Sequence, residues 1–208
     1  MADEVLVERR DGVQLITINR PEAKNALNKA VAEGVAAAVD ELDAADELRV
    51  GVLTGAGGTF SAGMDLKGFL RGESPAIEGR GLCGITQTPP RKPLIGAVEG
   101  WALAGGFELL LTGDPLNAAR AAEIGLVNRL TDEGAALDGA LDLAATIAAN
   151  GPLAVAATKQ IARSTGDWSW AESWQRQAEI TASLFAGEDA VERSTAVAEK
   201  RAPVWNWR

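Results

Sequence analysis

Residues 55–67 read Gly-Ala-Gly-Gly-Thr-Phe-Ser-Ala-Gly-Met-Asp-Leu-Lys and follow a short run of strand-forming residues. A second glycine-rich stretch, Gly100-Trp-Ala-Leu-Ala-Gly-Gly-Phe-Glu108, follows another such run. We expect each stretch to turn the chain from a strand into a helix, and to direct a backbone N–H at one point in space. Two converging N–H groups can stabilise a negatively charged oxygen without histidine, cysteine or metal.

The composition is that of an ordinary globular chain and narrows the possible chemistry. The 208 residues are 47% hydrophobic and 24% charged, which predicts one folded domain rather than disorder. The net charge of −9 argues against nucleic acid as the main partner. Because histidine is absent, Ser-His-Asp and Cys-His mechanisms are excluded. Acid–base chemistry near pH 7 must then fall to a carboxylate with a raised pKa, a lysine or a cysteine.

Three features predict a cytoplasmic protein without a membrane partner. The acidic beginning Met-Ala-Asp-Glu-Val lacks the apolar segment of a secretory signal. The longest apolar stretch, residues 93–111, carries Glu99, Glu108 and several glycines, which are unfavourable in a bilayer. The lone Cys83 cannot form an internal disulfide, as is usual in a reducing compartment.

Hydrophobic periodicity predicts an α/β arrangement for the first half of the chain. Asp11-Gly12 separates two strand-like runs and indicates a tight hairpin. Apolar residues at helical spacing from Leu27 to Leu42 predict a helix, and residues 72–88 are expected to form a surface loop with a short helix. We expect strands at 5–9, 13–19, 49–54 and 93–98, and a further helix over 64–70.

The second half is expected to be mainly helical. Helices are predicted at 117–124, 137–148, 152–163, 169–185 and 188–200, with a brief strand at 126–130. We therefore divide the chain into a core, residues 1–149, and a carboxy-terminal helical segment, residues 150–208. This segment holds five of the six tryptophans, Trp168, Trp170, Trp174, Trp205 and Trp207. They indicate either packing between helices or a subunit interface, and we favour the interface.

A nucleotide-binding loop is excluded at the first glycine turn. The turn lacks the Gly-Lys-Ser/Thr ending of a phosphate loop, and Phe60 occupies the place of a third dinucleotide-binding glycine. A purely structural connection between strand and helix stays open. For Glu108, a solvated glutamate in the first turn of a helix stays open beside a role in acid–base chemistry.

Several motifs, in order along nearly the whole chain, resemble those of the crotonase, or enoyl-CoA hydratase/isomerase, superfamily. They are residues 19–28 (Asn-Arg-Pro-Glu-Ala-Lys-Asn-Ala-Leu-Asn), the turns within 60–67 and 92–109, then 111–116, 119–128 and 198–201. The resemblance implies an α/β, crotonase-like fold of repeated ββα units with a carboxy-terminal helical segment. The Gly-Gly-Phe-Glu-Leu turn and residues 199–205 look most like the carnitinyl-CoA dehydratase branch.

The resemblance also implies roles for individual residues. It implies a hydratase, dehydratase or isomerase that stabilises the enolate of an acyl-CoA thioester. The N–H groups of Met64 and Gly105 would form the oxyanion hole, and Glu108 would be a general acid/base. The residues along the CoA moiety would be Ala23, Lys24, Ala62, Asp65 and Leu66. Candidates for contacts with its phosphates, or for solvated surface cations, are Lys24, Lys67, Arg71, Arg91 and Lys92.

The resemblance implies that the enzyme uses neither a metal nor a redox cofactor, because CoA arrives as part of the substrate. It also implies a homotrimer or a dimer of trimers.

The chain departs from the family pattern after residue 111. The helix opened by the second turn passes straight to Thr112-Gly-Asp-Pro115, so several dozen residues, with the second glutamate of hydratases, are missing. Either the sequence omits residues of the polypeptide, such as a segment disordered in a crystal, or the polypeptide carries an in-frame deletion. Loss of core elements should destabilise the fold, which favours the first explanation. The alternative functions are a non-catalytic acyl-CoA-binding protein and a nonfunctional truncated chain.

Overall fold

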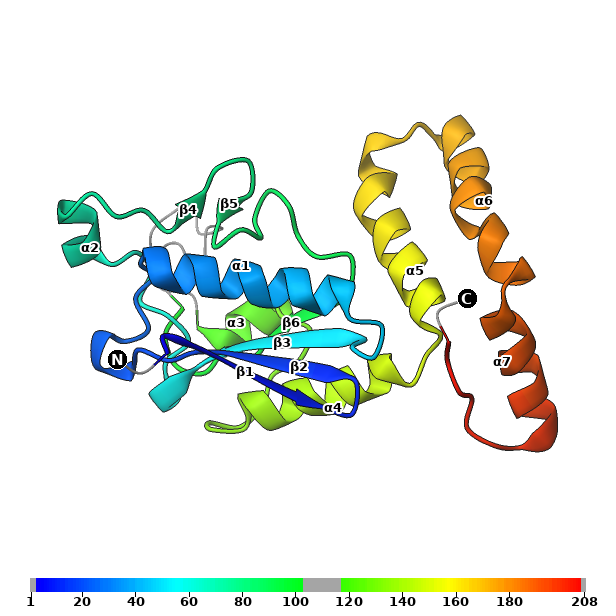
Figure 1. Cartoon of the computed structure of the whole chain (residues 1–208), viewed down its shortest axis with the longest axis horizontal. Coiled ribbons are helices and arrows are strands. Elements are labelled where there is room, and N and C mark those ends of the chain that lie inside the picture. Colours follow the sequence, from blue (N-terminus) through cyan, green and yellow to red (C-terminus); the bar gives the residue numbers. More distant parts are fainter. Residues whose placement is uncertain (1–2, 103–116, 207–208) are drawn as a thin grey trace.

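A four-stranded sheet with helices on both faces forms the core of the molecule (Figure 1). The computed structural model describes residues 3–102 and 117–206. The strands are β1 (Val5–Arg10), β2 (Val13–Ile18), β3 (Val50–Gly55) and β6 (Leu94–Gly96), in the order β1-β2-β3-β6. The pair β1–β2 is antiparallel, whereas β2–β3 and β3–β6 are parallel. The structure therefore confirms an α/β fold.

The hairpin between β1 and β2 forms where the sequence predicts it. Asp11 and Gly12 have φ values of +50° and +79°, and Arg10 pairs with Val13 across the turn. Two successive left-handed residues match the right-handed twist of the strands, which is why Asp-Gly favours this turn.

Two apolar layers bury the faces of the sheet. Helix α1 (Lys29–Ala44) packs on one face, where Ile16 and Val35 belong to one buried cluster. Helix α4 (Ala136–Ala148) lies on the other face, where Val52 and Ala144 belong to a second cluster (Figure 1). The helix begins later than predicted: α1 starts at residue 29, and Leu27, the first apolar residue of the predicted helix, forms a backbone bridge with Met64 instead.

The segments between the sheet strands contain short elements. They are η1 (Pro21–Ala23), η2 (Ala56–Gly58), α2 (Leu66–Leu70), β4 (Ala76–Ile77), β5 (Gly81–Leu82) and, later in the chain, α3 (Ala118–Glu123). The prediction of a short helix within 72–88 is wrong, since β4 and β5 form a small antiparallel ribbon there. The predicted strand at 126–130 is also wrong: residues 126–128 form bends, residues 129–130 are irregular, and none of them pairs with a described strand.

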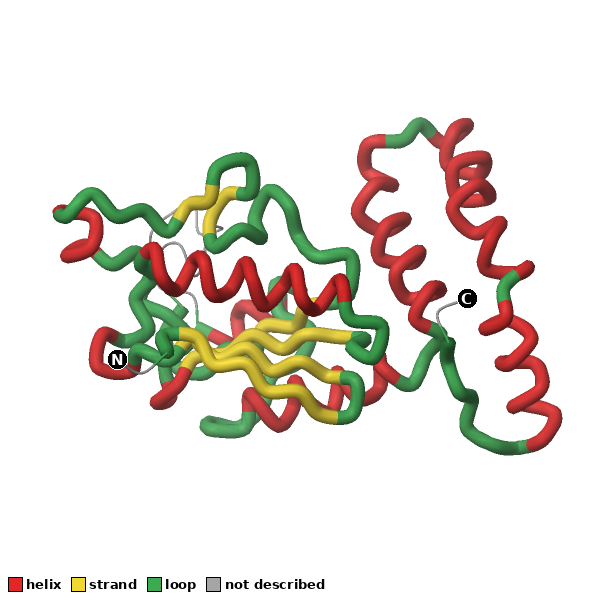
Figure 2. Tube along the Cα trace, in the orientation of Figure 1, coloured by secondary structure: helices red, strands yellow, loops and turns green. Residues whose placement is uncertain are grey.

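Three long helices make up the last part of the described chain and lie beside the sheet rather than on it (Figure 2). They are α5 (Pro152–Ser164), followed by η4 (Thr165–Asp167), α6 (Trp170–Ala186) and α7 (Glu188–Glu199). The chain then returns to the start of α5, where the Trp205 ring packs beside Gly151. A Cβ atom on Gly151 would lie 3.5 Å from this ring. Trp205 Nε1 donates to the Ala149 carbonyl at 3.1 Å, which ties the end of the chain to the α4–α5 junction.

No single helix in the described ranges has both the length and the apolar character to cross a bilayer. Among the described residues, only Ala136–Ala148 and Pro152–Asp167 taken together, across a bend of 110°, reach that length and composition.

Candidate active site

The two glycine turns lie side by side because they leave neighbouring parallel strands. Leu53 of β3 pairs with Gly96 of β6, so both strands end at the same edge of the sheet. Beyond that edge the Phe60 N–H donates to the Glu99 carbonyl at 2.8 Å. Ser61 then forms a parallel bridge with Ala102, which aligns the first turn with the second.

Gly55 allows the first turn to fold back on itself, and Gly100 allows the two turns to approach each other this closely. A Cβ atom on Gly55 would lie 2.2 Å from the Thr59 carbonyl oxygen. Gly100 has a φ of +59°, and a Cβ there would lie 2.4 Å from the Gly58 carbonyl oxygen. Real Cβ atoms do not come so near to backbone oxygen, so both positions require glycine for steric reasons.

A buried asparagine holds the first turn from within. Asn25 is fully buried, and its Oδ1 accepts from the Arg20 backbone N–H at 2.9 Å. Its Nδ2 donates to the carbonyls of Ala56 at 2.8 Å and Thr59 at 2.5 Å. The Ser61 hydroxyl donates to the Asn25 carbonyl at 2.9 Å. Asn25 thus satisfies the buried polar groups of a turn that has no regular hydrogen-bond ladder.

The backbone N–H of Met64 is directed away from the neighbouring segment at Leu27. The carbonyl of the preceding Gly63 accepts from the Leu27 N–H at 2.7 Å, and the Asp65 N–H donates to the Leu27 carbonyl at 2.8 Å. Because a trans peptide is planar, the Met64 N–H points opposite to the Gly63 carbonyl and away from Leu27. This N–H bonds to no residue within 3–102 or 117–206, and Met64 is 38% exposed. Such a group can donate to a ligand.

The residues predicted to line the CoA moiety come from two segments that the structure brings together. The Ala62 N–H donates to the Lys24 carbonyl at 2.9 Å, which places residues 23–24 against the first turn. Lys24 and Leu66 are exposed at this edge, and Ala23 is half-buried.

Asp65 has a structural role that sequence reasoning did not predict. Its Oδ2 lies 2.9 Å from Arg20 Nη2, and its Oδ1 accepts from the N–H groups of Lys67 and Gly68 at 3.0 Å each. The Gly68 N–H and then Arg20 lower the pKa of the Asp65 carboxyl, so it is ionised at neutral pH. The motif containing Arg20 and Asn25 was noted in the sequence, but nothing there linked either side chain to the first turn.

The remaining predicted catalytic residues, Gly105 and Glu108, lie outside the described residues. The part of the second turn that lies within the described residues ends at Ala102, which forms a backbone bridge with Ser61.

The structure corrects one of the predicted phosphate contacts. Lys92 is only 2% exposed, and its Nζ donates to the carbonyls of Leu42 and Ala45 at the end of α1. It therefore holds α1 in place and cannot reach a ligand. Arg71 pairs with Glu73, whereas Lys24 and Lys67 are exposed at the edge where the first turn lies.

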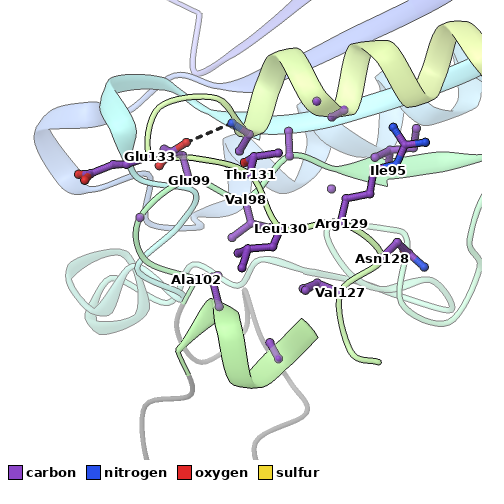
Figure 3. Close-up of a pocket in the computed structure, with 18 of the residues that line it drawn as sticks. Ile95, Val98, Glu99, Ala102, Val127, Asn128, Arg129, Leu130, Thr131 and Glu133 are labelled. Carbon is purple, nitrogen blue, oxygen red and sulfur yellow. Dashed lines mark hydrogen bonds between the residues drawn. The ribbon is translucent and has the colours of Figure 1, made fainter. Parts of the chain in front are cut away.

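A cavity of about 620 Å³ opens beside the second turn. It is bounded by residues 95–102, residues 126–133 and the first part of α4 (Figure 3). In the figure the Glu99 side chain reaches the start of α4, where Oε2 accepts from the Ala136 N–H at 3.3 Å. Glu99 stands in for a cap that α4 lacks, because Ala135 at the N-cap position has no side-chain acceptor.

The family model described as enoyl-CoA hydratase/isomerase matches residues 8–114 and again 108–208. An enoyl-CoA hydratase of Mycobacterium tuberculosis is 34% identical over 96% of this chain and 95% of its own length. A carnitinyl-CoA dehydratase of Salmonella typhi is 30% identical over the whole of both chains. A crystal structure of a probable enoyl-CoA hydratase/isomerase from Mycobacterium abscessus shares 48% identity and a TM-score of 0.94, covering 100% of both chains.

The same comparisons support the interruption predicted after residue 111. The two matches to the family model overlap at residues 108–114, as if one continuous pattern restarted there. The alignment with the Salmonella protein runs over 262 positions, yet this chain has 208 residues, so dozens of positions have no counterpart here. Apart from that interruption the match runs along the chain, and the solved relatives share its fold. The chain therefore belongs to the enoyl-CoA hydratase/isomerase family and has the crotonase fold.

Proposed function

We propose that this protein is an acyl-CoA hydratase, dehydratase or isomerase that stabilises a thioester enolate with two backbone N–H groups. The observation that carries the proposal is the Met64 N–H, which points away from Leu27 and has no acceptor among the described residues. The Ser61–Ala102 bridge brings the second turn, which leads to Gly105, alongside it. Relatives named enoyl-CoA hydratase and carnitinyl-CoA dehydratase support the same class of reaction.

In the proposed chemistry the thioester oxygen accepts hydrogen bonds from Met64 and Gly105. Negative charge grows on this oxygen as the α-carbon loses or gains a proton, so the bonds strengthen in the transition state. One such donor is typically worth about 3–4 kcal/mol. Glu108 is the proposed general acid/base, which moves a proton or activates the water that adds across the double bond.

The CoA moiety is proposed to run along residues 23–24 and the first turn. Ala23, Lys24, Ala62 and Leu66 are available at that edge. Asp65 would contribute there through its backbone, because its carboxylate is engaged by Arg20 and the start of α2. The proposal includes no metal or redox cofactor, and CoA enters as part of the substrate.

The alternative is a non-catalytic member that binds acyl-CoA. It is favoured by the positions missing between this chain and its relatives, since the second glutamate is expected among them. A protein that keeps the oxyanion donors but lacks one acid would bind thioesters and turn them over poorly.

We also propose a cytoplasmic homotrimer or dimer of trimers. The exposed aromatic surface of α6 supports the association of subunits in this proposal, because Trp170 and Trp174 are 79% and 64% exposed and contact each other edge to face. Large exposed aromatic side chains of this kind are typical of protein interfaces. Light scattering of the purified chain would give the mass of the assembly.

The test is the hydration of crotonyl-CoA by the purified chain, with Glu108→Ala as the inactive control. Glu8→Ala is the matched control, because Glu8 is an exposed carboxylate on β1, at the edge of the sheet opposite β6. We expect turnover that Glu108→Ala abolishes and Glu8→Ala leaves unchanged. Tight binding with turnover no better than that of Glu108→Ala would favour the binding protein, and failure to bind any acyl-CoA would refute both.

An intact mass of the same sample would decide between the two explanations of the missing stretch. A mass well above 21.6 kDa would mean that residues are absent from the printed sequence.

A further inference from the structure

We propose that the ion pair between Arg20 and Asp65 is a positioning device that holds the Met64 N–H toward the thioester oxygen. This inference rests on the proposed function. Arg20 and Asp65 do not contact the reacting atoms in it; they act through the backbone at Met64.

The pair joins two distant parts of the chain in a sheltered place. Arg20 Nη2 lies 2.9 Å from Asp65 Oδ2, and the two side chains are 13% and 11% exposed. Arg20 belongs to the motif at 19–28, and Asp65 is the residue directly after Met64. An ion pair that is largely removed from water is screened little by salt and has a defined geometry.

The guanidinium of Arg20 contacts both backbone segments that determine the orientation of Met64. One branch, Nη1, donates at 2.5 Å to the carbonyl of Ala26, the residue directly before Leu27. The other branch binds Asp65, directly after Met64. Leu27 in turn holds the Gly63 carbonyl and the Asp65 N–H on either side of the Met64 N–H. The planar fork of arginine therefore spans the same two segments that these backbone bonds join.

The two oxygens of Asp65 serve different partners. Oδ1 caps α2 through the N–H groups of Lys67 and Gly68, and Oδ2 alone binds Arg20. Asparagine is also a good helix cap, so Asp65→Asn keeps a cap acceptor and removes the charge that binds Arg20. The variant thus separates the two roles.

A matched control lies at the other end of the same helix. Glu73 Oε1 is 2.9 Å from Arg71 Nη2, but this pair is more exposed and contacts neither Leu27 nor Met64. Glu73→Gln makes the same change from a carboxylate to an amide, close to α2, without touching the backbone at Met64.

The experiment compares the dissociation constants of acetoacetyl-CoA and free CoA for the full chain. Acetoacetyl-CoA loses its α-proton readily, and in the resulting enolate the thioester oxygen shares the negative charge that an oxyanion hole recognises, whereas free CoA has no such oxygen. The ratio of the two dissociation constants therefore reports how well the N–H groups point at the thioester oxygen. Loss of folding would instead weaken both ligands together.

We expect Asp65→Asn to lower the preference for acetoacetyl-CoA about tenfold, since a small misplacement of a reacting group is costly. The affinity for free CoA should fall by less than the affinity for acetoacetyl-CoA, and Glu73→Gln should keep the wild-type ratio between the two ligands. An unchanged preference in Asp65→Asn, or an equal loss for both ligands, would overturn the inference. A wild type without any preference would instead contradict the proposed function itself.

If Asp65→Asn does not fold, Arg20→Lys provides the second measurement. Lysine keeps the positive charge but lacks the planar fork, so its single Nζ cannot reproduce the geometry in which Nη1 binds the Ala26 carbonyl and Nη2 binds Asp65. The same fall in preference is expected, and a ratio equal to that of the wild type would refute the positioning role.

Discussion

Ser61 and Ala102 form a parallel backbone bridge, although 41 positions separate them in the chain. The Ser61 N–H donates to the Trp101 carbonyl at 3.0 Å, and the Phe60 N–H to the Glu99 carbonyl at 2.8 Å. The two glycine turns are therefore joined by backbone contacts, and their approach requires a glycine at position 100, where a Cβ would meet the Gly58 carbonyl oxygen. The Asn25 side chain then holds the first turn through hydrogen bonds to the Ala56 and Thr59 carbonyls.

We expect Gly100→Ala to destabilise the protein and to abolish any thioester activity. The new Cβ would lie 2.4 Å from the Gly58 carbonyl oxygen, so the two turns must separate. Gly58→Ala is the matched control, because its φ of +73° is also left-handed but its Cβ would meet nothing within 4 Å. The control should lose about 1 kcal/mol in the free energy of unfolding, and Gly100→Ala about 3 kcal/mol or more. Equal losses in urea unfolding would contradict the steric explanation.

The ionisation of Asp65 should make the protein sensitive to acid. The pKa of this carboxyl is lowered in the folded state by the Gly68 N–H and by Arg20. Its stabilising contribution is complete above the unfolded value, about 3.9, and is lost as the pH falls through the lower folded value. The wild type should thus be more stable than Asp65→Asn at pH 6, and the difference should shrink below about pH 4. Urea unfolding of both proteins from pH 6 to pH 3 measures this, and a constant difference would speak against it.

Lys92→Met should destabilise the fold by about 2–4 kcal/mol. Burial lowers the pKa of Lys92, but Nζ still donates to the Leu42 and Ala45 carbonyls at 2.7 and 2.6 Å. Methionine fills a similar volume and leaves both buried carbonyls without that donor. Lys29→Met on the first turn of α1, where the lysine is 65% exposed, should change stability by less than about 0.5 kcal/mol. Thermal unfolding of the two variants gives the comparison.

Cys83 should resist thiol reagents while the protein is folded. Its side chain is buried in the cluster between α1 and the sheet, and burial raises the pKa of the thiol to about 11. The reactive thiolate is therefore scarce and shielded at pH 8. Labelling with Ellman's reagent should be slow in buffer and rapid in concentrated urea. Immediate labelling of the folded protein would show that this cluster opens easily.

Local patterns in the sequence predicted much of the fold. Asp11-Gly12 formed the expected hairpin because its preference for left-handed backbone acts within two residues. The stripe from Val31 to Leu42 predicted α1 because burial on one face needs only helical spacing. The short helix within 72–88 and the strand at 126–130 were predicted wrongly because these stretches lack periodicity and take their conformation from their neighbours.

The sequence by itself determined the family motifs, the two glycine turns and the absence of histidine. Only the tertiary structure decided which groups lie near the turns: the Met64 N–H pointing away from Leu27, the pairing of Arg20 with Asp65, and the burial of Lys92. The physical reason is distance along the chain. Backbone preferences and hydrophobic spacing act over a few residues, whereas hydrogen bonds between segments 40 or more positions apart depend on how the whole sheet and its helices pack.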